Sequence, residues 1–275
     1  MKPMLARSVD LHVTEQFLSD DRWVAQQKLD GDRILIRIAD GRAIALNREG
    51  KPRTNPVPRK VLDQFQPFTD LPGVWCFDGE LMTDGTLWLF DLPEASGRVT
   101  ANDPYEFRYA VLERFVAAGQ WPSAPCVRLL PVARTAETKR KLFAELNERG
   151  AEGLVFRHLD GLYRQGKRSD MMRKAKFTNT ADVIVHEVRA QGRNNCTFRL
   201  FDHGALVAAG SCSLEARPDV NPGDVIEVRY LYASNEGLLY QPVMLRIRDD
   251  KSPGECTVDQ LHYTDRTVLD LEDAQ

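Results

Sequence analysis

Residues 23–38 read WVAQQKLDGDRILIRI, two apolar runs separated by a charged turn. The runs Trp23–Gln27 and Ile34–Ile38 have strand character, and the Asp-Gly pair between them is a strong turn signal. Lys28 therefore stands where the first predicted strand ends. Taken alone, the hexamer from Lys28 to Arg33 is equally compatible with an ordinary turn that carries surface charges.

Outward from this stretch, the first part of the chain alternates short apolar runs with turns. Further strands are predicted at Ala43–Leu46, Val74–Phe77, Leu87–Phe90 and Gly153–Phe156. Helical periodicity marks Pro104–Ala118 and Glu137–Arg149, and Gly150 after the second segment is a common helix stop. Because successive strands are closely connected, we predict an α+β fold with antiparallel sheets.

The character of the chain changes after Phe177, where short strands follow one another without helices. Five strands are predicted at Asp182–Val188, Thr197–Phe201, Ala205–Ala209, Asp224–Tyr232 and Pro242–Ile247. Five strands in so short a segment suggest a small β-barrel such as an OB-fold. We expect two domains, residues 1–178 and 179–275, meeting in the polar stretch Thr178–Thr180.

Composition indicates a soluble globular protein. The 275 residues are 43% hydrophobic and 28% charged, and no apolar run is long enough for a transmembrane helix. The N-terminal residues lack the apolar core of a secretory signal. The five cysteines are widely spaced, which predicts neither a zinc site nor a disulfide framework. We therefore expect a cytoplasmic protein without a membrane partner.

The net charge of −3 argues against a nucleic-acid partner, but the charges are unevenly distributed. Between Arg157 and Lys176 there are seven Lys and Arg residues against Asp160 and Asp170, whereas residues 265–273 are acidic. A basic stripe of this kind is compatible with phosphate binding at one face. A solvated charged surface explains it equally well.

Six segments further along the chain contain charged or aromatic residues that could take part in chemistry at Lys28. They are NREG (Asn47–Gly50), FDGE (Phe77–Glu80), LWLFD (Leu87–Asp91), EGLVFR (Glu152–Arg157), MMRKAK (Met171–Lys176) and RDDK (Arg248–Lys251). With KLDGDR, the series resembles the motifs of covalent nucleotidyltransferases: ATP-dependent DNA ligases, RNA ligases and mRNA capping enzymes. The chain looks most like the minimal two-domain ATP-dependent DNA ligases.

This resemblance implies both a fold and an activity. The fold would be an ATP-grasp-like nucleotidyltransferase (adenylation) domain, residues 1–178, followed by an OB-fold β-barrel domain, residues 179–275. The activity would be the sealing of nicks in duplex DNA during replication, repair or recombination. The enzyme would act as a monomer, encoded by a bacterium or a phage.

Lys28 is identified by the resemblance as the nucleophile that becomes adenylated. A lysine amine attacks the α-phosphorus of ATP only when it is neutral, and nearby cations favour the neutral form. Lys174 and Lys176 would supply such cations and would stabilise charge on the phosphoryl oxygens. Asp30 would assist the metal ion or the 3′-hydroxyl. A magnesium or manganese ion would be held by Glu80 and Glu152, because hard cations prefer oxygen ligands.

The remaining predicted nucleotide contacts also come from the resemblance. Glu80 would bond the ribose hydroxyls, Arg33 would lie near the ribose and the nick, and Phe90 would stack on adenine, although plain core packing explains Phe90 nearly as well. Gln26 stands two residues before the nucleophile, where many relatives have Glu. Arg157 stands where the family usually has Lys. Arg248, Asp250 and Lys251 would reach the ATP phosphates when the OB domain closes.

Five arginines are predicted to contact DNA. Arg33 and Arg48 would face the nick, Arg48 being suited to hold the 5′-phosphate, and Arg164, Arg189 and Arg193 would contact the phosphate backbone. The loops at Ala190–Asn195 and Ser211–Pro222 are short, so we expect DNA to be held on a basic face without being encircled.

Two other functions remain compatible with the sequence. An RNA ligase or capping-type nucleotidyltransferase would use the same motifs, and a non-catalytic OB-fold nucleic-acid binder would retain them by chance. ATP is expected in preference to NAD because only 27 residues precede Lys28, too few for the nicotinamide-binding domain of the NAD-dependent relatives.

Overall fold

The computed structural model describes residues 1–119, 126–189, 194–214 and 220–263. These residues form two compact units, the first made of Met1–Ala144 with Gly153–Ala175, the second of Glu145–Glu152 with the chain from Lys176 onward. In the described part of the chain, no helix is long and apolar enough to cross a membrane.

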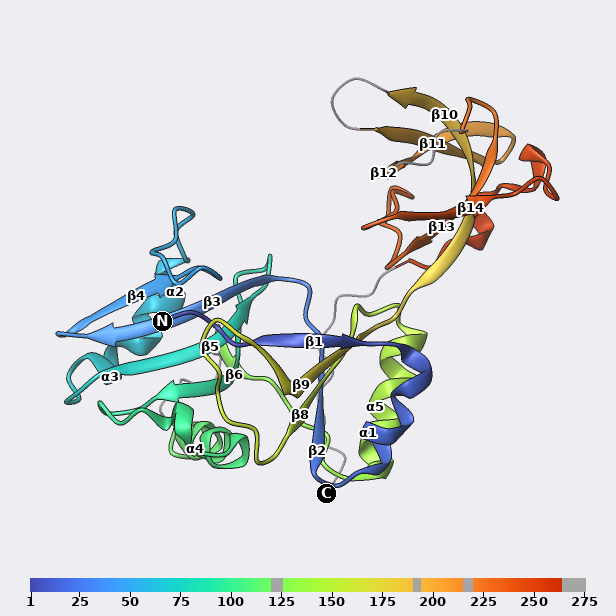
Figure 1. Cartoon of the computed structure of the whole chain (residues 1–275). Helices are drawn as coiled ribbons and strands as arrows, with labels where there is room; N and C mark the ends of the chain where they lie inside the picture. Colours follow the sequence, from blue (N-terminus) through green and yellow to red (C-terminus); the bar gives the residue numbers. More distant parts are fainter. Residues whose placement is uncertain (120–125, 190–193, 215–219, 264–275) are drawn as a thin grey trace. The chain divides into compact units, whose positions relative to one another are not determined.

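The first unit contains two β-sheets (Figure 1). One has the order β4-β3-β5-β6-β7, and the other has the order β1-β9-β8-β2. Their strands are β1 (Leu5–Val9), β2 (Trp23–Gln27), β3 (Asp32–Ala39), β4 (Arg42–Leu46), β5 (Trp75–Leu81), β6 (Leu87–Glu94), β7 (Val127–Leu129), β8 (Gly153–His158) and β9 (Arg168–Lys176). The predicted strands of this region and the α+β class are confirmed.

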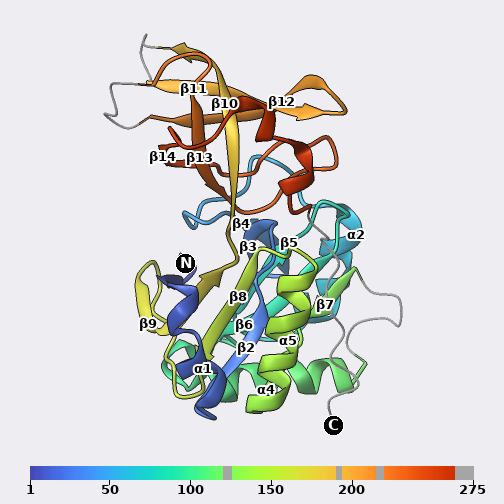
Figure 2. The same ribbon diagram turned by 90° about the vertical axis from the view of Figure 1, so that its right-hand side faces the viewer.

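Among the described residues, these sheets are accompanied by the α-helices α1 (Glu15–Ser19), α2 (Arg59–Leu62), α3 (Gln66–Thr69), α4 (Tyr105–Ala117) and α5 (Ala136–Glu148). The apolar face of β3, β5 and β6 packs against α2, α3 and α4 through an aromatic core that includes Phe65, Phe68 and Phe77. The buried ammonium of Lys139 in α5 donates to the carbonyls of Phe17, Asp20 and Trp23, which ties α5 to the start of β2. Figure 2 shows α1, α2, α4 and α5 in a view turned by 90° from that of Figure 1.

The sheets of the first unit are antiparallel, as predicted, except at two places. β1 pairs with β9 in parallel, and β6 pairs with β7 in parallel. Both pairs join strands that are far apart in the sequence, whereas the antiparallel prediction was based on closely connected neighbours. β1, β7 and β9 were not predicted, because β1 and β7 are short and most residues of all three strands are at least partly exposed.

The second unit contains one antiparallel sheet with the order β12-β11-β10-β13-β14. Its strands are β10 (Asn179–Arg189), β11 (Asn195–Asp202), β12 (Ala205–Ser213), β13 (Val225–Tyr230) and β14 (Val243–Ile247). All five predicted strands are present, and their inward faces form one apolar core with Phe198 and Tyr230. Among the described residues no ladder joins β12 to β14, so the sheet is not a closed barrel.

Candidate active site

A partly open cavity of about 170 Å³ lies in the first unit, between its two sheets. Six of the residues predicted from sequence line it: Gln26, Lys28, Arg33, Glu80, Phe90 and Lys174. Arg48, predicted to face the nick, also reaches its wall. The structure therefore brings together residues from β2, β3, β5, β6 and β9.

Lys28 is placed at this cavity by the end of strand β2. Its backbone N–H donates to the carbonyl of Gly153 at 2.8 Å, which fixes the end of β2 against the start of β8. Its side chain is half-buried, with Nζ 3.4 Å from the carbonyl oxygen of Leu29. A Cβ atom at Gly31 would come within 2.6 Å of the carbonyl oxygen of Leu81, so the turn after Lys28 admits only glycine.

The lining of the cavity is strongly cationic. Besides Lys28, the cations at its wall are Arg33, Arg48, Arg157, Arg168 and Lys174, whereas Glu80 is the one acid among the lining residues. Such a site favours an anionic ligand, since its charges converge on a partly enclosed space. A polyphosphate is the kind of ligand that this arrangement would attract.

Arg33 is held by two residues that sequence reasoning did not place in the site. Its guanidinium forms a bidentate pair with the buried Asp78, at 2.6 and 2.7 Å, and the hydroxyl of Tyr163 donates to the same carboxylate at 2.6 Å. Burial alone would lower the pKa of Arg33, but the charge and hydrogen bonds of Asp78 raise it above the ordinary value. Arg33 thus remains charged at the cavity wall.

A second buried acid, Asp91, pairs with Arg157, which lines the cavity. It pairs with Arg108 at 2.7 Å and with Arg157 at 3.4 Å, and none of the three side chains is more than 4% exposed. Burial alone would raise the pKa of Asp91, but the charges of Arg108 and Arg157 and the hydrogen bonds from Arg108 and the Leu92 N–H lower it. An acid inside the apolar run LWLFDL was the sequence signal for such a partner.

Phe90, predicted to stack on a base, contacts both Arg33 and Arg157. The guanidinium carbon of Arg33 lies 4.4 Å from the centre of its ring, and that of Arg157 lies 4.9 Å from it. The ring is only 4% exposed. It therefore serves both as core packing and as part of the cavity wall.

The two acids predicted to hold a metal are not equivalent. Glu80 lines the cavity, whereas Glu152 pairs with Lys176 at 3.0 Å, and this pair belongs to the second unit. The described residues contain no group of three His, Cys, Asp or Glu side chains placed to hold a metal ion. A magnesium ion fits such a site only if phosphates and water complete its coordination shell, as is usual for this ion.

Two other residues predicted for the site, Lys176 and Asp30, are not among the residues that line the cavity.

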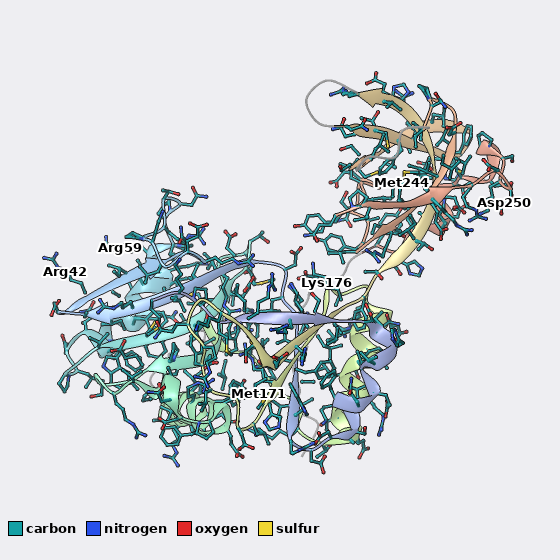
Figure 3. The ribbon with its side chains drawn as sticks, in the orientation of Figure 1. Arg42, Arg59, Met171, Lys176, Met244 and Asp250 are labelled. Atoms are coloured by element: carbon teal, nitrogen blue, oxygen red, sulfur yellow. The ribbon has the colours of Figure 1, made fainter. Side chains whose placement is uncertain are left out.

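The RDDK residues form an ion cluster within the second unit. Arg248 pairs with Asp250 through two contacts of 2.8 Å and with Asp182 at 3.0 Å, and Lys251 pairs with Asp182 at 2.7 Å. Asp250 is exposed at the surface of this unit (Figure 3). Asp182, which the sequence did not single out, holds both cations of the motif.

The pKa of Asp250 should report on this cluster. Hydrogen bonds from Arg248 are the main cause that lowers it to about 2. We expect Arg248→Ala to return it towards the ordinary value of about 3.9. The pair stabilises the fold above about pH 4 and loses that contribution as the pH falls through about 2. Carboxyl NMR titration would measure the change, with Arg189→Ala as the control, because Arg189 pairs with Glu187 and is not among the charges that lower the pKa of Asp250.

The remaining predicted DNA contacts lie outside the cavity. Arg164 is exposed in the loop between β8 and β9, and Arg189, also exposed, pairs with Glu187 at the end of β10. Arg193 lies outside the described residues, as do the acidic segment 265–273 and parts of the loops at Ala190–Asn195 and Ser211–Pro222.

The fold of this chain is similar to that of solved DNA ligases. A solved structure named "mycobacterial DNA ligase D complexed with ATP and MES" matches 94% of this chain and 98% of its own, with a TM-score of 0.56 and 22% identity. A Lig E DNA ligase matches 90% of this chain and 99% of its own, with a TM-score of 0.65 and 17% identity.

One relative in sequence is the multifunctional non-homologous end joining DNA repair protein LigD of Mycobacterium tuberculosis. It is 26% identical over 93% of this chain, and this chain spans 39% of its length. No protein-family model matches the chain. The resemblance to ATP-dependent DNA ligases predicted from the motifs is thereby confirmed.

Proposed function

We propose that this chain is an ATP-dependent DNA ligase that seals nicks in duplex DNA. The observation that carries the proposal is Lys28 at the wall of a cationic cavity that also contains Glu80, Phe90 and Lys174. All four are motif residues of the same family, contributed by separate strands. Two solved structures of similar fold, mycobacterial DNA ligase D and a Lig E protein, are both named as DNA ligases.

The reaction proceeds in three steps, two transfers of the AMP phosphorus followed by attack at the phosphorus of the DNA 5′-phosphate. The Lys28 amine attacks the α-phosphorus of ATP, pyrophosphate leaves, and the amine proton passes to solvent. The 5′-phosphate of the nick then takes AMP from Lys28, and Arg48 is suited to hold it bidentately. Finally the 3′-hydroxyl attacks the activated 5′-phosphate, and AMP departs as the phosphodiester forms.

The cationic wall has an electrostatic role in this scheme. Lys174 and Arg33 stabilise charge that develops on the phosphoryl oxygens, where positioning and electrostatics dominate the barrier. A magnesium or manganese ion held by Glu80, and by Glu152 in a closed form, would add Lewis-acid stabilisation of the same charge.

We assign the nucleotidyltransferase role to residues 1–178 and an OB-fold role to residues 179–275. Arg248, Asp250 and Lys251 would reach the ATP phosphates when the second domain closes, as would Lys176. Their ion cluster with Asp182 would be remodelled at that step. The enzyme would act as a monomer on nicked double-stranded DNA, with Asp30 assisting the last transfer.

A substrate panel tests the proposal. The purified protein is incubated with α-labelled ATP, magnesium and either nicked DNA or nicked RNA of the same sequence. We expect a labelled protein adduct and sealed DNA. Sealing of the RNA without activity on the DNA would replace the proposal with an RNA ligase. A protein that forms no adduct would be a binder without ligase activity.

DNA binding should weaken steeply with salt. Each phosphate neutralised by an Arg contributes about −0.9 to the slope of log affinity against log salt. We expect the double variant Arg48→Ala, Arg164→Ala to reduce the slope by about 2. Fluorescence anisotropy of a labelled nick measures it. Arg22→Ala is the control, since Asp20 already neutralises this exposed arginine at 2.7 Å. An equal loss in the control would exclude specific roles for Arg48 and Arg164.

A further inference from the structure

The side-chain amide of Gln26 is the feature that the proposed chemistry leaves unexplained. Gln26 lies in β2, lines the cavity and is only 1% exposed. Its Nε2 donates to the carbonyl of Leu130 at 3.0 Å, and its Oε1 accepts from Arg157 Nε at 2.9 Å and from the Tyr105 hydroxyl at 3.3 Å. A buried amide with this many partners has a fixed direction.

That direction follows from the chemistry of the partners. An arginine Nε can only donate a hydrogen bond, so the amide atom that faces Arg157 must be oxygen. A backbone carbonyl can only accept, so the atom that faces Leu130 must be nitrogen. The ordinary ambiguity between the two ends of a glutamine amide is therefore absent at this position.

After its contacts within the protein, the Gln26 amide has only a hydrogen-bond donor left for a ligand. The oxygen of Gln26 has two lone pairs, and Arg157 and Tyr105 use both. The nitrogen carries two N–H groups, and Leu130 takes one of them. Gln26 can therefore offer a bound molecule a donor but no acceptor.

Arg157 holds this arrangement in place. Its side chain is 4% exposed, pairs with Asp91 at 3.4 Å, and packs against the rings of Phe90 and Tyr105 at 4.9 and 5.1 Å. Asp91 is in turn fixed by Arg108. Turning the amide would place its N–H₂ group against a guanidinium, which leaves buried donors without acceptors.

We propose that Gln26 contacts the base only as a hydrogen-bond donor and that Arg157 is the positioning residue that fixes this polarity. An N–H pairs with the 6-oxo group of guanine or hypoxanthine, whereas in adenine it pairs only with a ring nitrogen and not with the 6-amino group. The nucleotide site then takes 6-oxopurine triphosphates, GTP and ITP, as well as ATP. The inference rests on the proposed function, because it presumes that Lys28 is nucleotidylated by a purine triphosphate.

The added reaction is the same transfer with a different base. The Lys28 nitrogen forms a bond to the α-phosphorus of GTP or ITP, and the bond from that phosphorus to the oxygen of pyrophosphate breaks. Pyrophosphate leaves with the electron pair, and the amine proton passes to solvent. No other reactant is needed.

The test compares rates of Lys28 labelling by α-labelled ATP and α-labelled GTP, with ITP as a competitor of each. A neutral hydrogen bond contributes about 1 kcal/mol, so we expect GTP and ATP to differ by less than about tenfold in kcat/KM. Gln26→Glu offers only acceptors to the base. We expect it to raise the ATP-to-GTP ratio by about tenfold or more.

Two variants of Arg157 separate positioning from stability. Arg157→Lys keeps a donor for the Gln26 oxygen and should leave the ratio unchanged. Arg157→Met removes the donor, frees the amide to turn, and should shift the ratio towards ATP. A ratio is independent of the fraction of folded enzyme, so loss of stability alone would not move it.

The outcomes are distinguishable from those that test the proposed function. Wild-type labelling by ATP with GTP more than a hundredfold poorer would overturn the inference and leave the ligase proposal standing. A ratio that Gln26→Glu does not change would do the same. Absence of label from every nucleotide would overturn the proposed function, and the inference with it.

Discussion

Lys28→Ala is expected to abolish formation of the protein–AMP adduct. Removal of a covalent nucleophile costs up to about 10⁶-fold in rate, because no neighbouring group can take its place. Lys28 is the lysine that ends β2 at the cavity, and Lys174 approaches the cavity from a different strand. Denaturing gel electrophoresis after incubation with α-labelled ATP measures the adduct directly.

The same variant should still seal a nick whose 5′-end is already adenylated. That last transfer needs the 3′-hydroxyl and the phosphate-binding residues but not the nucleophile. Lys60→Ala, an exposed lysine in α2, is the control and should behave as the wild type in both assays. An adduct that persists in Lys28→Ala would show that another residue is the nucleophile.

Asp91→Asn is expected to lower the free energy of unfolding by about 3–5 kcal/mol, the usual cost of removing one partner from a buried ion pair. The variant leaves Arg108 and Arg157 facing a neutral amide inside the protein. Urea denaturation followed by tryptophan fluorescence measures the loss. Asp63→Asn is the control, because the pair of Asp63 with Arg59 is exposed and should contribute less than about 0.5 kcal/mol.

The pH dependence of stability supplies a second signature of Asp91. Its pKa is lowered in the folded protein, so ionised Asp91 stabilises the fold above the unfolded pKa of about 3.9. This contribution is lost as the pH falls through the folded value. Wild type should therefore lose more stability than Asp91→Asn between neutral pH and acid. Parallel acid unfolding curves would mean that Asp91 is not ionised in the folded protein.

Local patterns were sufficient to predict most of the elements. The run Trp23–Gln27 is β2 without a change of bounds, and Pro104–Ala118 differs from α4 by one residue at each end. Alternating apolar residues and turn residues act over a few positions, which makes them readable from one sequence. The motif order likewise predicted that Lys28, Glu80 and Phe90 meet at one cavity.

Long-range partnerships could not be predicted in this way. Nothing near Asp91 in the sequence indicates that its partners are Arg108 and Arg157, and nothing near Arg248 indicates Asp182. The parallel pairing of β1 with β9 was not predicted for the same reason. Such contacts depend on how distant segments pack, which periodicity within a window does not record.

The bond from Arg157 to Gln26 joins positions 131 residues apart, and β2 pairs with β8 over a similar interval. During synthesis at about 5–20 residues per second, the nascent β2 strand waits roughly ten seconds for that partner. An unpaired apolar strand is a template for aggregation, and the charged turn KLDGDR directly after it is the kind of flank that discourages such pairing. The charged residues of this turn, which carry the proposed nucleophile in the folded protein, thus also discourage aggregation of the nascent chain.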